Sequence, residues 1–413
     1  MRETWKKILL KDACKVFADG DWIESKDQSS DGIRLVQTGN IGFGYFKDKE
    51  DKSRFISEET FLRLKCTEIL PGDLLVSRLP DPVGKSCIIP EINSKMITGV
   101  DCTIIRPKDN LSSEFLCYYQ MSNQYLKDVQ SGVSGATRQR ISRKNLGIIE
   151  IPLPPFPEQQ RIVAILDEAF AAIDKAKANA EQNLKNAKEL FESYLQGVFE
   201  NKGEGWEMKT IQEITKVVNG YAFSSKDFKS TNTIKSVKIT NVGVKEFVEE
   251  TENFLPEKFK ETLKEYQVRE GNIVIALTRT IISAGLKVAV VPESYDRALI
   301  NQRVAALVPN EKIVNQRYLY NFLITDGVAK YVLAHVNTLM QPNLSINDLR
   351  NLSVPCPSLK EQQAIVQKLD ALSLETKRLE AIYQQKINDL EELKKSVLQK
   401  AFSGELKGKL VTV

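Results

Sequence analysis

Residues 158–167 read EQQRIVAILD, and residues 361–370 read EQQAIVQKLD, 203 positions later. The match extends without a gap over residues 151–199 and 354–402, where IPLPPFPEQQRIVAILD lies over VPCPSLKEQQAIVQKLD. An internal repeat of this length indicates that the chain uses one structural unit twice. We interpret the two halves of the chain as versions of one unit, each a variable globular part followed by a similar helical part.

Each copy of the phrase predicts a long helix. Four prolines precede the first helical stretch, and Ser358 and Glu361 have capping-box spacing at the start of the second. Apolar residues then recur at three- and four-residue spacing, which is typical of a left-handed coiled coil. The alternative is two long helices that pack on separate cores.

The predicted seam can be listed by position. In the first helix it comprises Leu166, Ala169, Ile173, Ala176, Ala180, Asn183, Ala187, Leu190 and Tyr194. In the second helix it comprises Leu369, Leu372, Thr376, Leu379, Tyr383, Lys386, Leu390, Leu393 and Val397. Asn183 and Lys386 occupy equivalent positions, where polar residues can fix the register, or can simply be tolerated in a solvated seam.

The duplication also predicts how the helices run. The first helix leaves the first globular part and ends at the second, so an equivalent second helix must return. We therefore expect antiparallel helices, a pseudo-two-fold axis, and a C-terminus near the first globular part.

Short apolar runs alternate with turn signals in each globular part, for example LLVS at 74–77 and IVIA at 273–276. Helical stretches are expected near 112–130 and 316–335. The predicted fold class is α+β: two similar α/β globular domains separated by two long antiparallel helices that form a coiled coil. We place the globular domains at 1–152 and 203–355, the first long helix at 153–202, and the second helix with the C-terminal tail at 356–413.

Composition narrows the function classes. The chain has 413 residues, 42% of them hydrophobic and 27% charged, with a net charge of +4. It lacks an apolar run of the roughly 18 residues that a membrane span needs. The N-terminus lacks the features of a signal peptide. The six cysteines show no CxxC pair and no disulfide-type spacing, so we expect reduced thiols in a cytoplasmic protein without membrane contact.

Known catalytic motifs are incomplete. His335 is the single histidine, and a lone histidine in an apolar stretch is more often packed than catalytic. DPVGKS at 81–86 resembles the end of a Walker A loop, but Leu79 stands where that loop needs glycine. GNIGFG at 39–44 has the wrong spacing for a dinucleotide fingerprint. We expect no catalytic residue, no metal and no cofactor.

Two diverged domains on a rigid spacer suit the recognition of two different short base sequences, here called words, at a fixed distance. A helix of about 42 residues is roughly 63 Å long, which is on the scale of about two DNA turns. The segment RQRISRK at 138–144 combines arginines, which bind guanine bidentately, with a glutamine, which binds adenine. The alternative is a solvated charge run before a helix. The candidate DNA-binding residues are Arg78, Lys85, Arg138, Gln139, Arg140, Arg143, Lys144, Arg279, Lys287, Gln341 and Asn343.

The chain resembles the specificity subunit of type I restriction–modification systems, HsdS. The resemblance covers essentially the whole length. It rests on the two proline-rich phrases that run into EQQ, on LSINDL at 344–349, and on the long helix after each phrase. The regions before the phrases match by pattern only.

The resemblance implies a function. Residues 1–152 and 203–355 would be target recognition domains, each reading one part of a split, asymmetric site in double-stranded DNA. The helices would act as a ruler and as the docking surface for two modification subunits, which bind S-adenosylmethionine and methylate adenine. Restriction subunits would complete the nuclease.

Two rival functions differ in class from a DNA reader. One is a methyltransferase in its own right, which the missing NPP[YF]-type motif disfavours. The other is a coiled-coil scaffold or DNA clamp outside restriction–modification.

Overall fold

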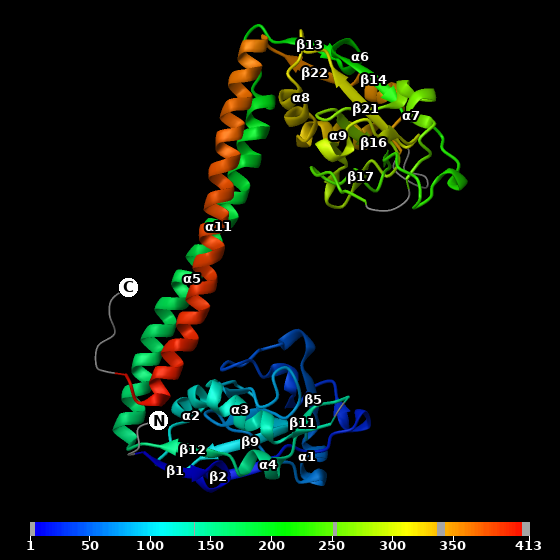
Figure 1. Cartoon of the computed structure of the whole chain (residues 1–413). Helices are drawn as coiled ribbons and strands as arrows, with labels where there is room; N and C mark the ends of the chain where they lie inside the picture. The colour runs from blue at the N-terminus through cyan, green and yellow to red at the C-terminus, as the bar shows by residue number, and fades with distance from the viewer. Residues whose placement is uncertain (1–4, 136, 251–253, 337–342, 407–413) are drawn as a thin grey trace. The chain divides into compact units, whose positions relative to one another are not determined.

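The computed structural model describes residues 5–135, 137–250, 254–336 and 343–406. It divides into two compact units: unit 1 is Met1–Glu181 with Gln384–Val413, and unit 2 is Gln182–Tyr383. Each unit contains one globular domain and parts of both long helices, α5 (Phe156–Glu200) and α11 (Leu359–Ser403) (Figure 1). Within the described residues, no helix combines the length and apolar character that a membrane span requires.

Two four-stranded sheets form the centre of the unit 1 domain. The antiparallel sheet has the order β2-β9-β6-β7, with strands Cys14–Asp19, Cys102–Pro107, Leu74–Ser77 and Ser86–Ile88. The mixed sheet has the order β3-β5-β4-β8, with strands Gln28–Ser29, Arg54–Ile56, Ile33–Val36 and Met96–Thr98. Alternate residues of β6 enter different cores, Leu74 and Val76 on one face and Leu75 on the other. A strand buried on both faces reads as a continuous apolar run, as LLVS does.

Short helices cover one face of the antiparallel sheet. α2 (Ser113–Gln120), α3 (Asn123–Ser131) and α4 (Arg143–Gly147) each begin after a serine whose hydroxyl accepts a hydrogen bond from a backbone N–H of the first turn. A further helix, α1 (Glu58–Leu64), follows β5. The domain is closed by β1 (Lys6–Leu9), which pairs antiparallel with β12 (Glu150–Leu153) just before α5.

Unit 2 repeats this plan. Its four-stranded antiparallel sheet has the equivalent order β14-β21-β16-β19, with strands Thr215–Asn219, Val304–Pro309, Ile273–Ala276 and Val288–Val290. β13 (Glu207–Thr210) pairs with β22 (Ser353–Cys356) just before α11. The other elements are α6 (Ile211–Ile214), β15 (Ser236–Val237), α7 (Phe259–Thr262), β17 (Ile281–Ile282), β18 (Gly285–Leu286), β20 (Leu299–Ile300), α8 (Gln316–Leu323), α9 (Asp326–His335) and α10 (Ile346–Asn351).

The first glutamine of the phrase EQQ joins α5 to the unit 1 domain. Gln159 is fully buried. Its amide nitrogen donates to the carbonyls of Asn110 and Pro154, both at 2.9 Å, and its oxygen accepts from the backbone N–H of Ser112 at 2.8 Å. The glutamine therefore satisfies three backbone groups at the junction of loop, α2 and α5.

Gln362 makes the same bonds at the equivalent positions of unit 2. It donates to Ile313 O at 3.0 Å and Pro357 O at 2.9 Å, and it accepts from Asn315 N at 2.8 Å. The following glutamine is exposed in both copies. The repeated phrase thus attaches each long helix rigidly to the domain that precedes it.

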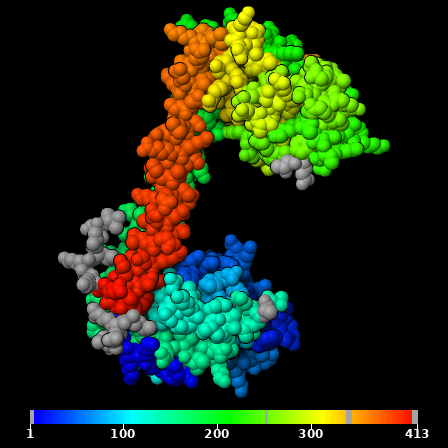
Figure 2. Space-filling view, viewed as in Figure 1, coloured from blue at the N-terminus to red at the C-terminus, as the bar shows by residue number. Residues whose placement is uncertain are grey.

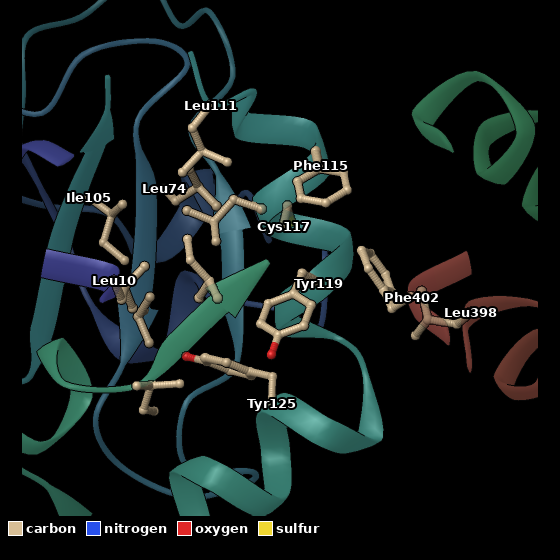
Figure 3. Close-up of a cluster of buried hydrophobic side chains, with 14 of the residues drawn as sticks. Leu10, Leu74, Ile105, Leu111, Phe115, Cys117, Tyr119, Tyr125, Leu398 and Phe402 are labelled. Carbon is tan, nitrogen blue, oxygen red and sulfur yellow. The ribbon is translucent and has the colours of Figure 1, made fainter. Parts of the chain in front are cut away.

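The C-terminal end of each long helix packs through a phenylalanine. The ring of Phe402 lies 5.5 Å from that of Phe115 and 5.3 Å from that of Tyr119 (Figure 3). In unit 2, the equivalent Phe199 lies 5.2 Å from Tyr318. Figure 2 shows the end of α11 against the α2 and α3 region of unit 1. The predicted proximity of the C-terminal helix end to the first domain is confirmed.

The two helices run antiparallel, as predicted. In unit 1, Lys394 of α11 bonds to Asp174 of α5 at 2.7 Å, and Lys177 bonds to Glu391 at 2.6 Å. In unit 2, the C-terminal part of α5 shares a hydrophobic core with the N-terminal part of α11. The predicted fold class, with two similar α/β domains and a pair of antiparallel helices, is confirmed.

The predicted seam is correct for the first turns of α5 and wrong in its middle. Asn183 and Lys386 are exposed, and so is Leu190, at 48%. From Ala187 the inward-facing positions advance by two successive four-residue steps, to Phe191 and then to the buried Leu195. Such a stutter locally unwinds a coiled coil and rotates the later residues out of a strict 3.5-residue frame. Asn183 and Lys386 therefore do not fix the register.

Candidate nucleic-acid interface

A short hairpin presents the RQR sequence of unit 1. β10 (Val133–Ser134) pairs with β11 (Arg140–Ile141), and Arg138 and Gln139 are exposed on the connecting loop. Gly135 has φ +97°, and a Cβ there would lie 2.4 Å from the carbonyl oxygen of Arg138. Glycine is therefore required for the loop to close tightly enough to hold both side chains at its tip.

Four predicted arginines and two carboxylates come together around this hairpin, and we call them the arginine cluster. The cluster consists of Arg78, Arg138, Arg140, Arg143, Asp19 and Asp101. Asp101 lies 3.0 Å from Arg140 and 3.8 Å from Arg138. Asp19 lies 3.5 Å from Arg78 and 3.9 Å from Arg143. Four cations against two anions leave a local positive excess, which suits a polyanionic ligand.

Arg78 lies beneath this surface. Its side chain donates to the carbonyl of Val100, and its own carbonyl accepts from Ile141 N of the hairpin at 3.2 Å. Burial lowers the pKa of the Arg78 guanidinium, and Asp19 acts in the opposite direction. With 5% of its surface exposed, Arg78 supports the hairpin rather than reaching outward.

Lys85 belongs to a second group of cations in unit 1. Its ammonium donates to the carbonyl of Asp81 at 3.0 Å. Burial lowers the pKa of Lys85, and the nearby charges of Lys47 and Lys49 lower it further. Lys144 is exposed on α4. These lysines extend the positive character of the unit 1 surface.

Exposed aromatic residues accompany the cations, and the sequence reasoning missed them. Trp22 is 69% exposed and Tyr45 57% exposed, and the ammonium of Lys47 lies 5.6 Å from the centre of the Tyr45 ring. Trp22, Gln37 and Asp101 line a cavity of about 210 Å³. Base–aromatic stacking and cationic side chains are typical of nucleic-acid surfaces. Tyr45 directly follows the glycine-rich stretch GNIGFG at 39–44, which was the available signal in the sequence.

Unit 2 arranges its candidates differently. Arg279 is exposed, and Lys287 donates to the carbonyl of Ile239 at 2.5 Å. Burial lowers the pKa of Lys287, and Arg279 lowers it further. Asn343 is exposed and forms an isolated bridge with Thr278. Gln341 lies outside the described residues.

The loops that carry Arg78 and Arg279 match, but the two arginines are not equivalent. Arg78 N donates to Asp101 O at 2.9 Å, and it is Leu277 N that makes the equivalent bond, to Arg303 O at 2.8 Å. Arg279 lies further along a loop that the β17–β18 hairpin enlarges. The structure therefore adds Arg303, an exposed residue that the sequence reasoning did not single out.

Other sequence predictions concern possible catalytic groups. His335 stacks on Tyr331 with ring centres 4.0 Å apart, and it is exposed rather than buried. All six cysteines are buried and free. Burial raises the pKa of the Cys66 thiol to about 11, so that thiol is a poor nucleophile at neutral pH. The described residues contain no group of three or more histidine, cysteine, aspartate or glutamate side chains that could hold a metal ion.

Comparison with known proteins places the chain in a family. The model of the type I restriction modification DNA specificity domain matches twice, at residues 2–185 and 203–392. The MjaVIII specificity subunit of Methanocaldococcus jannaschii is 26% identical over 333 residues, covering 77% of this chain and 76% of the relative. The EcoKI specificity subunit of Escherichia coli K12 is 24% identical over 398 residues, covering 91% and 83%.

Solved structures share the fold. The HsdS subunit of Thermoanaerobacter tengcongensis superposes with a TM-score of 0.67 at 19% identity, covering 98% of each chain. A chain from a structural study of type I restriction–modification complex assembly superposes with a TM-score of 0.75 at 18% identity, covering 98% of this chain and 99% of that one. Because the family model matches both halves, the resemblance found in the sequence is confirmed: the chain belongs to the family of type I restriction–modification DNA specificity subunits.

Proposed function

We propose that the chain gives a type I restriction–modification complex its DNA sequence specificity, with each globular domain reading one part of a split, asymmetric site. The observation that carries the proposal is the double match to the specificity domain, combined with two domains that share a fold and differ in surface chemistry. The chain itself is a non-catalytic subunit, as are the specificity subunits of its family.

In unit 1, we propose that the exposed members of the arginine cluster contact DNA together with Gln139, Lys85 and Lys144. Arginine forks suit guanine edges, and glutamine suits adenine. Lysines beside them suit phosphates, which fix the register of a protein on the duplex. Exposed Trp22 and Tyr45 add apolar and stacking contacts.

In unit 2, we propose DNA contacts by Arg279, Lys287, Gln341 and Asn343. An exposed arginine beside a partly buried lysine gives a smaller cationic group than that of unit 1. The residue equivalent to Arg140 is Asn343, whose amide matches adenine rather than guanine. We therefore propose that the two domains read different words.

We also propose that two modification subunits bind the paired helices, and that restriction subunits join the complete complex. An internal repeat offers two related surfaces, one for each copy of a partner. Large apolar side chains are exposed along both helices, including Leu190 of α5 at 48% and Leu374 of α11 at 74%. The fixed attachment of each helix through Gln159 or Gln362 makes it suitable as a ruler between the two half-sites.

Selection from a random duplex library tests this function. The chain, purified with its modification subunits, is incubated with the library at physiological salt, and retained duplexes are sequenced. Specific recognition is typically at least about a thousandfold stronger than non-specific binding, so the retained sequences are expected to share two short words at a constant separation. A retained pool with no common word would contradict the proposal.

A further inference from the structure

The two units share a backbone arrangement beneath the proposed DNA surface but place different charges on it. The residue after β6 is Arg78 and the residue after β16 is Leu277, and each donates its N–H to the residue before the neighbouring strand. In unit 1 that neighbour is Asp101, whereas in unit 2 it is Arg303. A carboxylate and a guanidinium therefore start from equivalent backbone positions.

A third position changes with them. Asp19 ends β2 opposite Thr103 of β9, and Asn219 ends β14 opposite Ala305, the equivalent residue of β21. Asp19 lies 3.5 Å from the guanidinium of Arg78. A buried arginine requires charged or hydrogen-bonding partners, whereas a leucine requires none. The replacement of Arg78 by leucine in unit 2 is thus matched by the loss of both carboxylates.

In unit 1 the carboxylates also hold two further arginines. Asp101 lies 3.0 Å from Arg140, and Asp19 lies 3.9 Å from Arg143. Free arginine side chains lose substantial rotamer entropy when they bind. A guanidinium that a carboxylate already holds loses less rotamer entropy on binding. It is also fixed in one orientation, so it discriminates better between base edges.

In unit 2 the equivalent arginine stands alone. Arg303 is exposed, and it has no ion-pair partner within 4.0 Å among the residues that the structure describes. The backbone N–H of Arg303 donates to the side-chain oxygen of Asn301 at 3.4 Å. This contact involves only the main chain of Arg303 and does not occupy its guanidinium. Its five donors are available to an acceptor outside the chain.

We propose that positions 101 and 303 are equivalent specificity-determining positions that the two domains use in opposite ways. Asp101 is a positioning residue that holds Arg140 in the orientation for a base contact, whereas Arg303 itself contacts DNA. This inference rests on the proposed function and deepens it, because it assigns to each domain a different means of recognition at one site of the fold.

The test uses the full chain purified with its modification subunits and compares Asp101→Asn with wild type. The amide keeps the size of the side chain but releases Arg140, so discrimination at one base position of the first word is expected to fall about tenfold. At the same time the freed cation becomes available to phosphate, so non-specific affinity is expected to hold or rise and its salt slope to steepen by about one. The second word stays unchanged, and Asp101→Glu restores part of the discrimination.

The matched variant in unit 2 is Arg303→Gln. It is expected to relax the second word and to leave the first word intact. A uniform loss of affinity with a salt slope smaller by about one would make Arg303 a phosphate contact and overturn its specificity-determining role. Loss of specific and non-specific affinity together in Asp101→Asn would overturn the positioning role, and so would unchanged discrimination. Unchanged binding by Arg303→Gln would overturn the contact in unit 2. If the wild-type chain selects no common word, the proposed function itself fails. If the wild type selects two words and neither variant changes them, only the inference about positions 101 and 303 fails.

Discussion

Replacement of Gln159 by alanine tests the junction between domain and helix. The change removes three hydrogen bonds at 2.8–2.9 Å from a side chain with no exposed surface. The bond to Pro154 is buried and the other two are partly buried, and a fully buried backbone group left without a partner costs about 1–3 kcal/mol. Partial relaxation and water entry offset some of this cost, so we expect unit 1 to lose about 3–5 kcal/mol of unfolding free energy, at the upper end for a single substitution.

The matched control is the neighbouring Gln160→Ala. Gln160 is exposed, and surface substitutions usually change stability by less than about 0.5 kcal/mol. Denaturant unfolding with probes in each unit gives the two free energies separately, since a chain with two units does not unfold as one two-state system. Hydrogen exchange at the Ser112 amide provides a local readout, because its acceptor is the Gln159 side chain.

Unit 2 serves as the internal reference for this experiment. Gln159→Ala should leave its unfolding free energy unchanged, and Gln362→Ala should reverse the pattern. Equal stability of the Gln159→Ala and Gln160→Ala variants would refute the reasoning, as would a Ser112 amide that exchanges at the wild-type rate.

Three further predictions follow from other contacts. Replacing Arg138 and Arg140 by alanine should relax one word only, by about 1–3 kcal/mol per lost guanine contact; selection from random duplexes checks this, and equal loss in both words would count against it. Phe402→Ala should destabilise the end of α11 on unit 1 by about 3–5 kcal/mol, while Leu374→Ala at a 74% exposed site changes little; hydrogen exchange distinguishes the two. Because burial and a neighbouring arginine lower the pKa of Lys287, its charge is lost at lower pH than that of an ordinary lysine. DNA affinity should therefore begin to fall earlier as pH rises, and Lys287→Arg should flatten the profile in titrations at constant ionic strength; coincident profiles would contradict this role.

The architecture was predictable because the duplication and the long periodic segments are local features of the sequence. Gapless alignment of the two EQQ phrases implies equivalent helices, and that equivalence alone requires them to be antiparallel. The seam was predicted less well, since a strict 3.5-residue frame assigns Leu190 and Asn183 to the interface. Packing against the partner helix shifts the frame by a stutter, and a single sequence does not show where that shift occurs.

The candidate interface was only partly predictable. Arg138 and Arg140 are two residues apart in sequence, so their proximity was evident, but their shared carboxylate Asp101 comes from the distant turn before β9. The polar loop sequence around Arg78 gave no indication that this side chain would be buried. Trp22 was missed because an isolated aromatic residue gives no sign of its exposure, which depends on how neighbouring loops fold.

Sequencing of methylated adenines in genomic DNA tests the central claim most directly. Cells that carry the modification subunits are compared with and without the gene for this chain. We expect the gene to add methylation at one asymmetric site made of two short words with a constant spacer, and Arg140→Ala to alter one of those words alone. Methylation that does not depend on the gene, or that falls on one continuous word, would contradict it.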